Sequence, residues 1–598
     1  MTNDSLLIAS VVLDQLVQTG VREIFFAPGS RSAPFVYSVA GRDGRDLRAH
    51  VRLDERSAAF HALGAARATG VPSAVVTTSG TAVGNVFPAV LEADHAQVPL
   101  IVVTADRPLE LRGTGANQTT RQPGIFGDHV RASVDITLPP GITPEQCVSE
   151  VAQTVESTLG VVCGGPETQP GPVHLNVALR EPLHPALSET PGEGHDGAAP
   201  SAVWDTRGLH LACAVQMTRE QQESVRDAAS CLPRRRTVIL AGDGAGYAAG
   251  QLAEALHLPL LAEPSSGARH GANAVDAYRL LVETDIGAAI DHVVLMGRPT
   301  LSRPITALLR REDVRTAAWQ PEPVAWYEPG RRRETVLTTL HDVLEFAGRG
   351  DSTWTHEWKN RGRQAIDAVM TELADVARRN PGYLPGPVVA REIWQACGLD
   401  GALLVAGASN PIRDLDLVAA AGHDAQSGPM PHPAGVIANR GLAGIDGTVA
   451  TASGAALATG MPTRALVGDL TFLHDAGSLL KLAMEQQPDL TIVVVDDRGG
   501  GIFTTLEHGA LGQRKLWANT VERFFGTEPD VDIPALCRAY GVPVVSVGTV
   551  DELQEHMRRP VQGVSVVVVH AQRESLRDVN RRIEHAVARR GSAAPAWP

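Results

Sequence analysis

Two aspartates in the C-terminal part of the chain each stand directly after an apolar segment. Asp469 follows residues 464–467, and Asp497 follows residues 490–495, 28 positions further on (497 minus 469). This spacing leaves room for a crossover helix between adjacent parallel strands, so both carboxylates are expected at one sheet edge, where ligands of such folds bind. Together with a backbone carbonyl of the glycine run 499–501, they predict a site for Mg²⁺ and the phosphate oxygens that it commonly takes.

Glu55 is a third acid of interest, because it precedes the alanine-rich, helix-like residues 57–68. An acid in the first turn of a helix is usually explained by the helix dipole. Capping of strand-end turns likewise explains Asp469 and Asp497 about as well as metal binding does. The three acids taken singly therefore leave their function open.

Apolar runs without polar alternation, separated by helix-like segments, would position these acids. Such runs are typical of parallel sheets covered on both faces. A chain of 598 residues is also too long for one hydrophobic core, and the sequence predicts three α/β domains. The expected strands are 24–26, 74–77 and 100–104, then 237–241 and 292–296, then 402–405, 464–467 and 490–495.

Two stretches that contain few apolar residues divide the chain. Residues 188–201 read as a linker, and residues 348–352 mark a second break. The predicted domains are therefore 1–187, 202–350 and 351–598.

Composition and charge narrow the class of protein. A formal net charge of -14 disfavours nucleic-acid binding. The N-terminal residues lack the basic region of a signal peptide, and no apolar run reaches membrane-spanning length, which predicts a cytoplasmic protein without a membrane span. The six cysteines form no Cys-x-x-Cys pair, so we expect reduced core residues rather than a zinc site or disulfides.

Several loop motifs in the first and third regions resemble thiamine diphosphate enzymes. The diphosphate motif of that superfamily reads Gly-Asp-Gly, a spacer, then Asn-Asn; here Leu470 replaces the second glycine and residues 496–498 read Asp-Asp-Arg. The wider set of motifs resembles the MenD family, the 2-succinyl-5-enolpyruvyl-6-hydroxy-3-cyclohexene-1-carboxylate synthases. These motifs are residues 27–32, 54–56, 78–82, 104–108, 115–119, 439–441 and 444–447.

The resemblance implies a thiamine diphosphate-binding fold in the first and third domains, for the pyrimidine and the diphosphate respectively, and a Rossmann-like middle domain. It implies a transferase of menaquinone biosynthesis that decarboxylates 2-oxoglutarate and adds the succinyl-type carbanion to isochorismate. The implied cofactors are thiamine diphosphate and Mg²⁺ or Mn²⁺. The implied assembly is a homodimer or homotetramer with active sites at the subunit interface.

The resemblance also assigns roles to individual residues. Glu55 would bond N1′ of the aminopyrimidine, Ile445 would support the bent cofactor, and Phe503 would supply an apolar wall. Arginines would pair with the four carboxylates of the two substrates. The implied catalytic residues are Glu55, Arg31, Arg107, Asn117, Gln118, Arg303, Ser409, Arg413, Arg440 and Phe503. The implied cofactor residues are Glu55, Ser79, Gly80, Gly444, Ile445, Gly468, Asp469, Asp497, Gly499, Gly500 and Ile502, with Asp469, Asp497 and Gly499 on the metal.

Three other functions remain open at this point. Residues 244–249 read Gly-x-Gly-x-x-Ala after an expected strand, and Glu263 ends the next apolar run, which is the pattern of a flavin- or nicotinamide-binding oxidoreductase. A vestigial Rossmann-like spacer explains the same pattern without a ligand. Another thiamine diphosphate enzyme, such as an acetolactate synthase or 2-oxo acid decarboxylase, is a closer alternative, and a catalytically inactive interaction protein is the third.

Overall fold

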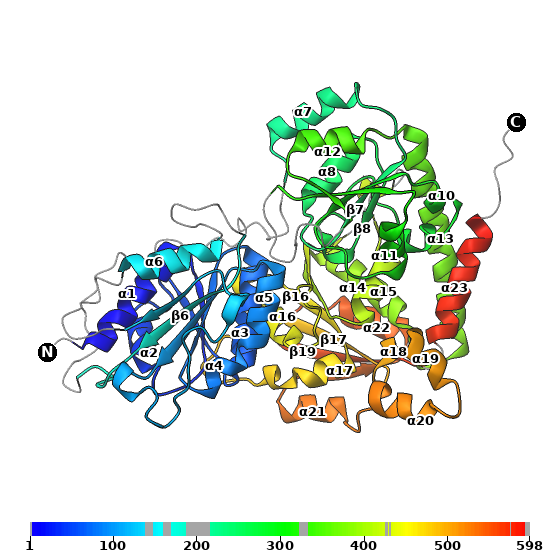
Figure 1. Cartoon of the computed structure of the whole chain (residues 1–598). Helices are drawn as coiled ribbons and strands as arrows, with labels where there is room; N and C mark the ends of the chain where they lie inside the picture. The colour runs from blue at the N-terminus through cyan, green and yellow to red at the C-terminus, as the bar shows by residue number, and fades with distance from the viewer. Residues whose placement is uncertain are drawn as a thin grey trace, which may run out of the picture.

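The computed structural model describes residues 3–137, 148–159, 169–186, 216–321, 333–421, 423–424, 428–429, 432–573 and 576–591. Within these ranges the chain forms three parallel sheets, each covered by helices, as the sequence predicted. Figure 1 shows the N-terminal domain running from blue to cyan, the middle domain in green, and the C-terminal domain running from light green through yellow to red. The expected linker 188–201 lies outside the described residues, and the exact domain limits stay predictions.

The first domain is a six-stranded parallel sheet in the order β2-β1-β3-β4-β6-β5. The segment at residues 82–93, which looks like one helix in the sequence, is divided into α4 and α5, because Pro88 in the first turn of α5 cannot continue a preceding helix. The strands are β1 (Glu23–Phe26), β2 (Arg48–Val51), β3 (Ser73–Thr77), β4 (Leu100–Asp106), β5 (Ser133–Ile136) and β6 (Val173–Ala178). The helices are α1 (Asp4–Gln18), α2 (Ala33–Ala40), α3 (Glu55–Thr69), α4 (Thr81–Asn85), α5 (Phe87–Ala96) and α6 (Val148–Glu156).

The middle domain has five parallel strands in the order β11-β10-β9-β7-β8. A continuous apolar core joins its sheet to helices α13 (Ser352–Arg379) and α14 (Gly386–Asp400) of the C-terminal domain, so these two domains are packed firmly together. The strands are β7 (Thr237–Ala241), β8 (Leu260–Ala262), β9 (His292–Met296), β10 (Arg315–Trp319) and β11 (Thr335–Leu337). The helices are α7 (Arg219–Ala229), α8 (Tyr247–Ala255), α9 (Tyr278–Leu281), α10 (Asp285–Ala288), α11 (Arg303–Arg310) and α12 (Leu340–Ala347).

The C-terminal domain repeats the topology of the first, since its order β15-β12-β16-β17-β19-β18 is also 2-1-3-4-6-5 when strands are counted within the domain. The strands are β12 (Leu403–Ala406), β15 (Gly435–Ile437), β16 (Thr463–Gly468), β17 (Leu490–Asp496), β18 (Val544–Val547) and β19 (Val564–His570), with a separate antiparallel pair β13 (His423–Asp424) and β14 (Gly428–Pro429). The helices are α13 (Ser352–Arg379), α14 (Gly386–Asp400), α15 (Asn410–Val418), α16 (Thr448–Thr459), α17 (Asp469–His474), α18 (Gly501–Thr505), α19 (Glu507–Gly512), α20 (Ala518–Val521), α21 (Ile533–Ala539), α22 (Val550–Met557) and α23 (Leu576–Gly591).

Two expectations from the sequence concerned membrane spans and the burial of cysteines. No helix within the described ranges is long and apolar enough to cross a bilayer. Cys397 and Cys537 are buried as expected, but Cys231 is exposed, so the expectation that the cysteines are core residues is wrong there. Cys231 follows the strongly polar helix α7, where only Val225 is buried. Cys147, Cys163 and Cys213 lie outside the described residues.

Helices α3 and α16 join the first and third domains (Figure 1). Their backbones almost touch: a Cβ on Gly64 would lie 2.1 Å from the carbonyl oxygen of Thr451, and a Cβ on Gly454 would lie 2.0 Å from that of His61. Real Cβ atoms do not approach an oxygen this closely, so both glycines are needed for the crossing. The alanine-rich sequence of the two helices follows from the same lack of space.

We expect Gly454→Ala to lower the melting temperature, because its methyl group would meet backbone that cannot rotate away. Overpacking of this kind costs about 1–3 kcal/mol. Gly250→Ala is the matched control, since Gly250 is also a buried helical glycine but an added Cβ there has its nearest neighbour at 3.5 Å. The control should be neutral or slightly stabilising. Equal effects of the two substitutions in thermal unfolding would contradict the close crossing.

Candidate active site

A cavity of about 340 Å³ opens at the carboxyl edge of the C-terminal sheet. Its walls come from the loops that follow β12, β15, β16 and β17, which is the expected place for a ligand in a parallel sheet. The volume is in the range of small-molecule and cofactor sites. The predicted site residues that line it are Ser409, Arg413, Arg440, Ile445, Gly468, Asp469, Asp497, Gly499, Gly500, Ile502 and Phe503.

The two aspartates predicted from their spacing both face this cavity. The Asp469 carboxylate accepts hydrogen bonds of 2.7 Å from the backbone N–H groups of Leu470 and Gly499. Burial raises the pKa of Asp469 to about 6. Burial, together with the charge of Asp469, raises the pKa of Asp497 to about 8. A divalent cation between the two carboxylates would remove this mutual repulsion, so the donor set fits Mg²⁺ or Mn²⁺.

Glycines are required at positions 499–501, after β17, because other atoms of the protein approach this backbone closely. Gly499 has a φ of +132°, and a Cβ on it would lie 2.2 Å from the carbonyl oxygen of Gly526. The N–H of Gly500 donates to the same carbonyl at 2.7 Å. Gly501, which is not among the implied cofactor residues, has no room for a Cβ because the Asp497 carboxylate would lie 2.0 Å away. The loop thus folds tightly around the predicted metal ligand.

Two predicted substrate arginines also line the cavity. Arg440 is only 4% exposed and donates from both Nε and Nη2 to the Thr300 hydroxyl. Arg413 donates to the carbonyl of Ser409 at 2.7 Å. Burial and the neighbouring charges of Arg440 and Arg279 lower the pKa of Arg413. Concentrated positive charge of this kind suits a ligand with several carboxylates.

Asp414 is a cavity residue that sequence reasoning missed. Its carboxyl lines the cavity, and loss of solvent raises its pKa to about 7. It lies within helix α15, where an Arg-Asp pair has the pattern of an ordinary solvated helix face. The side chain is enclosed only because α14 begins at Gly386, where an added Cβ would lie 2.3 Å from Asp414 Oδ2. No local sequence pattern predicts this packing.

A second group of predicted residues gathers at the carboxyl edge of the first sheet. Arg107 donates from Nε and Nη2 to the carbonyl of Asn117, at 3.3 and 3.0 Å. Ser79 and Gln118 exchange two bonds: Ser79 Oγ donates to the Gln118 carbonyl at 2.8 Å, and Gln118 Nε2 donates to the Ser79 carbonyl at 3.1 Å. Gly80, at a φ of +84°, allows Gln118 to approach. The half-buried Glu55 carboxylate accepts a bond of 3.1 Å from Asn85.

The structure does not bring the two groups together within one chain, since none of the first-domain residues lines the 340 Å³ cavity. Gly444, although it adjoins Ile445, is not part of the cavity lining either. Arg31 is buried and donates to the carbonyl of Leu179 at 2.9 Å. Arg303 is 65% exposed and pairs with Glu507 at 2.8 Å.

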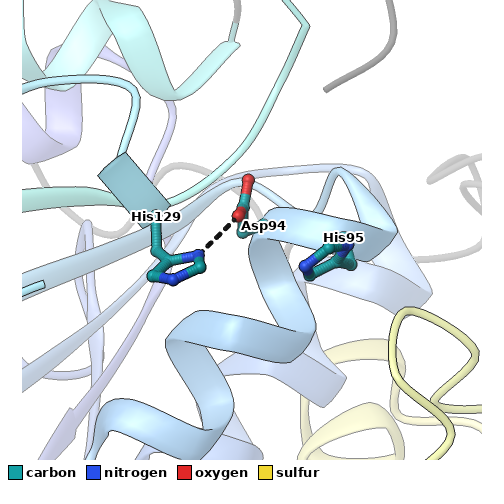
Figure 2. Close-up of side chains that lie close together, drawn as sticks. All are labelled: Asp94, His95 and His129. Carbon is teal, nitrogen blue, oxygen red and sulfur yellow. Dashed lines mark hydrogen bonds and ion pairs between the residues drawn. The ribbon is translucent and has the colours of Figure 1, made fainter. Parts of the chain in front are cut away.

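Another cluster with metal-ligand chemistry is formed by Asp94, His95 and His129 (Figure 2). His129 Nδ1 lies 3.0 Å from one Asp94 oxygen, as the dashed line in Figure 2 marks. Arg131 Nη1 donates to the other oxygen at 2.5 Å. The carboxylate is therefore already balanced by an arginine, and the cluster is explained as an ion-pair network.

The glycine motif of the middle domain has the expected strand–loop–helix context between β7 and α8. Glu263, however, is only 1% exposed, and its Oε1 accepts the N–H groups of Thr300 and Leu301 at 2.9 and 3.1 Å. It is not available for the ribose hydroxyl that the acid of a dinucleotide fingerprint binds. This geometry disfavours the oxidoreductase alternative.

Comparisons with known proteins agree with this geometry. Family models described as thiamine pyrophosphate enzyme, N-terminal and C-terminal TPP binding domains, match residues 7–125 and 421–571. Curated proteins named 2-succinyl-5-enolpyruvyl-6-hydroxy-3-cyclohexene-1-carboxylate synthase are similar over nearly the whole chain. That of Paenarthrobacter aurescens (strain TC1) is 46% identical over 97% of this chain and 96% of its own, and that of Arthrobacter sp. (strain FB24) is 47% identical over 97% and 91%. The solved benzoylformate decarboxylase from Polynucleobacter necessarius shares the fold, with a TM-score of 0.63 and 16% identity over 96% of this chain and 99% of that one.

Mg²⁺ and protons should compete for the Asp469 and Asp497 carboxylates. Because both pKa values are raised, to about 6 and about 8, a cation must displace bound protons near neutral pH. The apparent affinity for Mg²⁺ should therefore increase as pH rises through this interval. Calorimetric titration of the protein with Mg²⁺ in the presence of thiamine diphosphate measures this dependence.

Two variants distinguish titration of the protein's carboxylates from titration of the diphosphate as the cause of this pH dependence. Asp497→Asn should bind Mg²⁺ more weakly and with a shallower pH dependence, since one titrating ligand is lost. Asp496→Asn removes the neighbouring carboxylate, which does not line the cavity and is a minor cause of the raised pKa values of Asp469 and Asp497, so this variant should keep most of the wild-type dependence. Identical pH profiles for all three proteins would exclude the aspartate pair as the metal site.

Proposed function

The chain belongs to the 2-succinyl-5-enolpyruvyl-6-hydroxy-3-cyclohexene-1-carboxylate synthase family of thiamine diphosphate enzymes, and we propose that its two residue groups are the halves of one active site. The enzyme decarboxylates 2-oxoglutarate and joins the remaining four-carbon unit to isochorismate. The observation that carries this proposal is that one cavity is lined by two carboxylates able to bind a metal ion, by the buried Arg440 and by the half-buried Arg413. Such a cavity can hold a diphosphate at one side and anionic substrates at the other.

The cofactor would be held mainly by the C-terminal domain. Asp469, Asp497 and the carbonyl of Gly499 would bind Mg²⁺ or Mn²⁺, and through it the diphosphate. Bound thiamine diphosphate supplies the electron sink that allows a 2-oxo acid to lose carbon dioxide. The loop residues Gly468, Gly500 and Ile502 would contact the diphosphate end, with Gly444 and Ile445 supporting the ring system. Ser79 and Gly80 would meet the pyrimidine end.

The first-domain group would transfer a proton on the cofactor and bind the second substrate. Glu55 would hold or move the proton at N1′ of the aminopyrimidine. Arg107, with Asn117 and Gln118 beside it, would bind isochorismate. Because the Arg107 guanidinium donates only to a backbone carbonyl in the described chain, its charge is available to a carboxylate.

The arginines of the cavity would bind the remaining carboxylates. Arg413 and Arg440 line it directly, Ser409 adds a neutral partner, and Phe503 supplies an apolar wall. Arg31 is enclosed in the first domain and Arg303 pairs with Glu507, so both would have to exchange a present partner for substrate.

A complete site would require two copies of the chain. Since no first-domain residue lines the cavity, the Glu55 group of one subunit would face the cavity of its partner in a homodimer, or in a homotetramer built from such pairs. We place the enzyme in the cytoplasm, since Cys231, Cys397 and Cys537 are unpaired thiols, which fits a reducing compartment.

Mass analysis of products tests the activity directly. The purified enzyme with thiamine diphosphate and Mg²⁺ should form the succinylated cyclohexene product only when 2-oxoglutarate and isochorismate are both present. A control with each substrate omitted in turn should lack this product. Efficient turnover of small neutral 2-oxo acids, with no product from isochorismate, would instead indicate another thiamine diphosphate decarboxylase or carboligase.

The subunit arrangement can be tested by complementation between two inactive variants. Glu55→Gln should abolish exchange of the cofactor C2 proton, because an amide cannot relay a proton through N1′, and Asp469→Asn should abolish metal-supported cofactor binding. If the site is shared, each mixed dimer contains one intact site. Subunit exchange should then recover about a quarter of wild-type activity from an equal mixture, by random pairing of the two chains. No recovery, despite mixed dimers detected by mass spectrometry, would place each site within a single chain.

Arg107→Ala should weaken isochorismate binding while leaving thiamine diphosphate affinity unchanged. Loss of a hydrogen bond from a charged group costs roughly 1.5–3 kcal/mol, or about one to two decades in affinity. Arg107→Lys should restore only part of this, since an ammonium lacks the planar fork of a guanidinium. Steady-state kinetics with isochorismate varied measures the effect, and release of succinic semialdehyde should increase. An unchanged KM in the alanine variant would make Arg107 a structural residue.

A further inference from the structure

The guanidinium of Arg440 is held by a residue of the middle domain. Its Nε and Nη2 both donate to the hydroxyl oxygen of Thr300, at 3.1 and 2.5 Å, across 140 positions of sequence. Arg440 itself is buried, whereas Thr300 is exposed. The orientation of a cavity arginine thus depends on a hydroxyl group that belongs to another domain.

The segment that carries Thr300 is itself fixed at several points. Glu263 accepts the N–H groups of Thr300 and Leu301, and Arg298 donates to the carbonyl of Gly441 at 2.7 Å. Gly242, two residues before the glycine motif, permits close packing, since an added Cβ there would lie 2.1 Å from the nitrogen of Pro299. Gly242 and Glu263, the acid that suggested a dinucleotide site, therefore act in this structure to shape the segment 298–301.

The chemistry of this support suits an arginine that must bind an anion. A hydroxyl oxygen accepts from the guanidinium without neutralising it. Nη2 also donates to the Thr300 carbonyl at 3.4 Å, and the two N–H groups of Nη1 stay available. Within the described ranges Arg440 forms no ion pair, and its charge contributes to lowering the pKa of Arg413. Burial raises the pKa of Glu263 to about 8, so this nearby carboxyl is largely uncharged at neutral pH and does not compete with an anionic ligand for Arg440.

We propose that Thr300 and Glu263 of the middle domain are positioning residues, which orient the Arg440 guanidinium towards a carboxylate of a substrate. Thr300 acts directly through its hydroxyl, and Glu263 acts by holding the backbone of Thr300 and Leu301. The inference rests on the proposed role of Arg440 in substrate binding. It assigns the middle domain a part in the reaction that a simple spacer would not have.

Thr300→Val tests the hydroxyl, because valine keeps the shape of threonine but offers no acceptor. KM for one of the two carboxylate substrates should rise about 3- to 10-fold, the change expected for one ordinary hydrogen bond. Affinity for thiamine diphosphate and the melting temperature should stay near wild type, since Thr300 is exposed. Thr300→Ser retains the hydroxyl and should restore KM.

Ser302→Ala is the matched control for loss of a hydroxyl in the same segment. Ser302 Oγ has no partner in the described chain, so its removal should leave both KM values unchanged. A melting temperature lowered by Thr300→Val with unchanged KM, or a failure of Thr300→Ser to restore KM, would overturn the positioning role. So would an equal rise in KM for Ser302→Ala.

Arg440→Gln separates failure of this inference from failure of the active-site assignment. If Arg440 binds substrate, Arg440→Gln raises KM for one substrate, and adding Thr300→Val to it has no further effect. If Arg440→Gln leaves both KM values unchanged, the proposed role of Arg440 is wrong. If Arg440→Gln raises KM but Thr300→Val does not, Arg440 keeps its role and only the positioning inference is rejected.

Glu263 provides an independent pair of variants. Glu263→Gln keeps an oxygen that can accept both backbone N–H groups and should retain nearly wild-type KM. Glu263→Ala removes that acceptor and should raise KM for the same substrate as Thr300→Val, together with a lower melting temperature. A rise in KM for the other substrate, or a lower melting temperature alone, would contradict the connection between Glu263 and Arg440.

Discussion

The contact between helices α3 and α16 is the constraint on which the arrangement of the outer domains depends. Gly64 meets the carbonyl of Thr451 and Gly454 meets that of His61, so each glycine contacts the residue three positions before the other glycine. This reciprocity gives the crossing a local two-fold character. Both helices follow the second strand of their six-stranded sheet, and the two sheets share one strand order. A single close packing therefore relates two sheets of the same topology.

The shared topology explains how one fold supplies two different kinds of surface. In the first and third domains, the loops after the first four strands of the six-stranded sheet carry the predicted site residues. In the first domain they present Glu55, Arg107 and neutral hydrogen-bonding groups. In the third they present Asp469 and Asp497 for a cation, and Arg440 beside them. The crossing of α3 and α16 fixes the place of Glu55 at the start of one helix and of residues 444–447 just before the other.

The strands, and the position of Asp469 and Asp497 at the edge of a sheet, were predictable because their signals are local. Unalternating apolar runs identify buried parallel strands, and an aspartate after such a run must lie at a sheet edge. The conformation of a long side chain, in contrast, depends on contacts with residues far away in the sequence. Arg31 was expected in the site but bonds to the carbonyl of Leu179, 148 residues away, and Asp414 was missed because helix packing encloses it. Glu263 matched a ribose-binding pattern, yet tertiary contacts turn it towards backbone N–H groups.

The loop that carries Arg440 receives contacts from both of the other domains. Glu92 of α5 accepts the N–H groups of Gly441 and Leu442, both at 2.7 Å, and Arg298 of the middle domain donates to the carbonyl of Gly441. Each of these contacts pairs a backbone group of the loop, in which Gly441 is buried and Leu442 is exposed. Because two other domains supply these partners, a shift of either one would leave a backbone group without its partner. The position of Arg440 is thus determined by the assembly of the whole chain, and its own domain alone would not fix it.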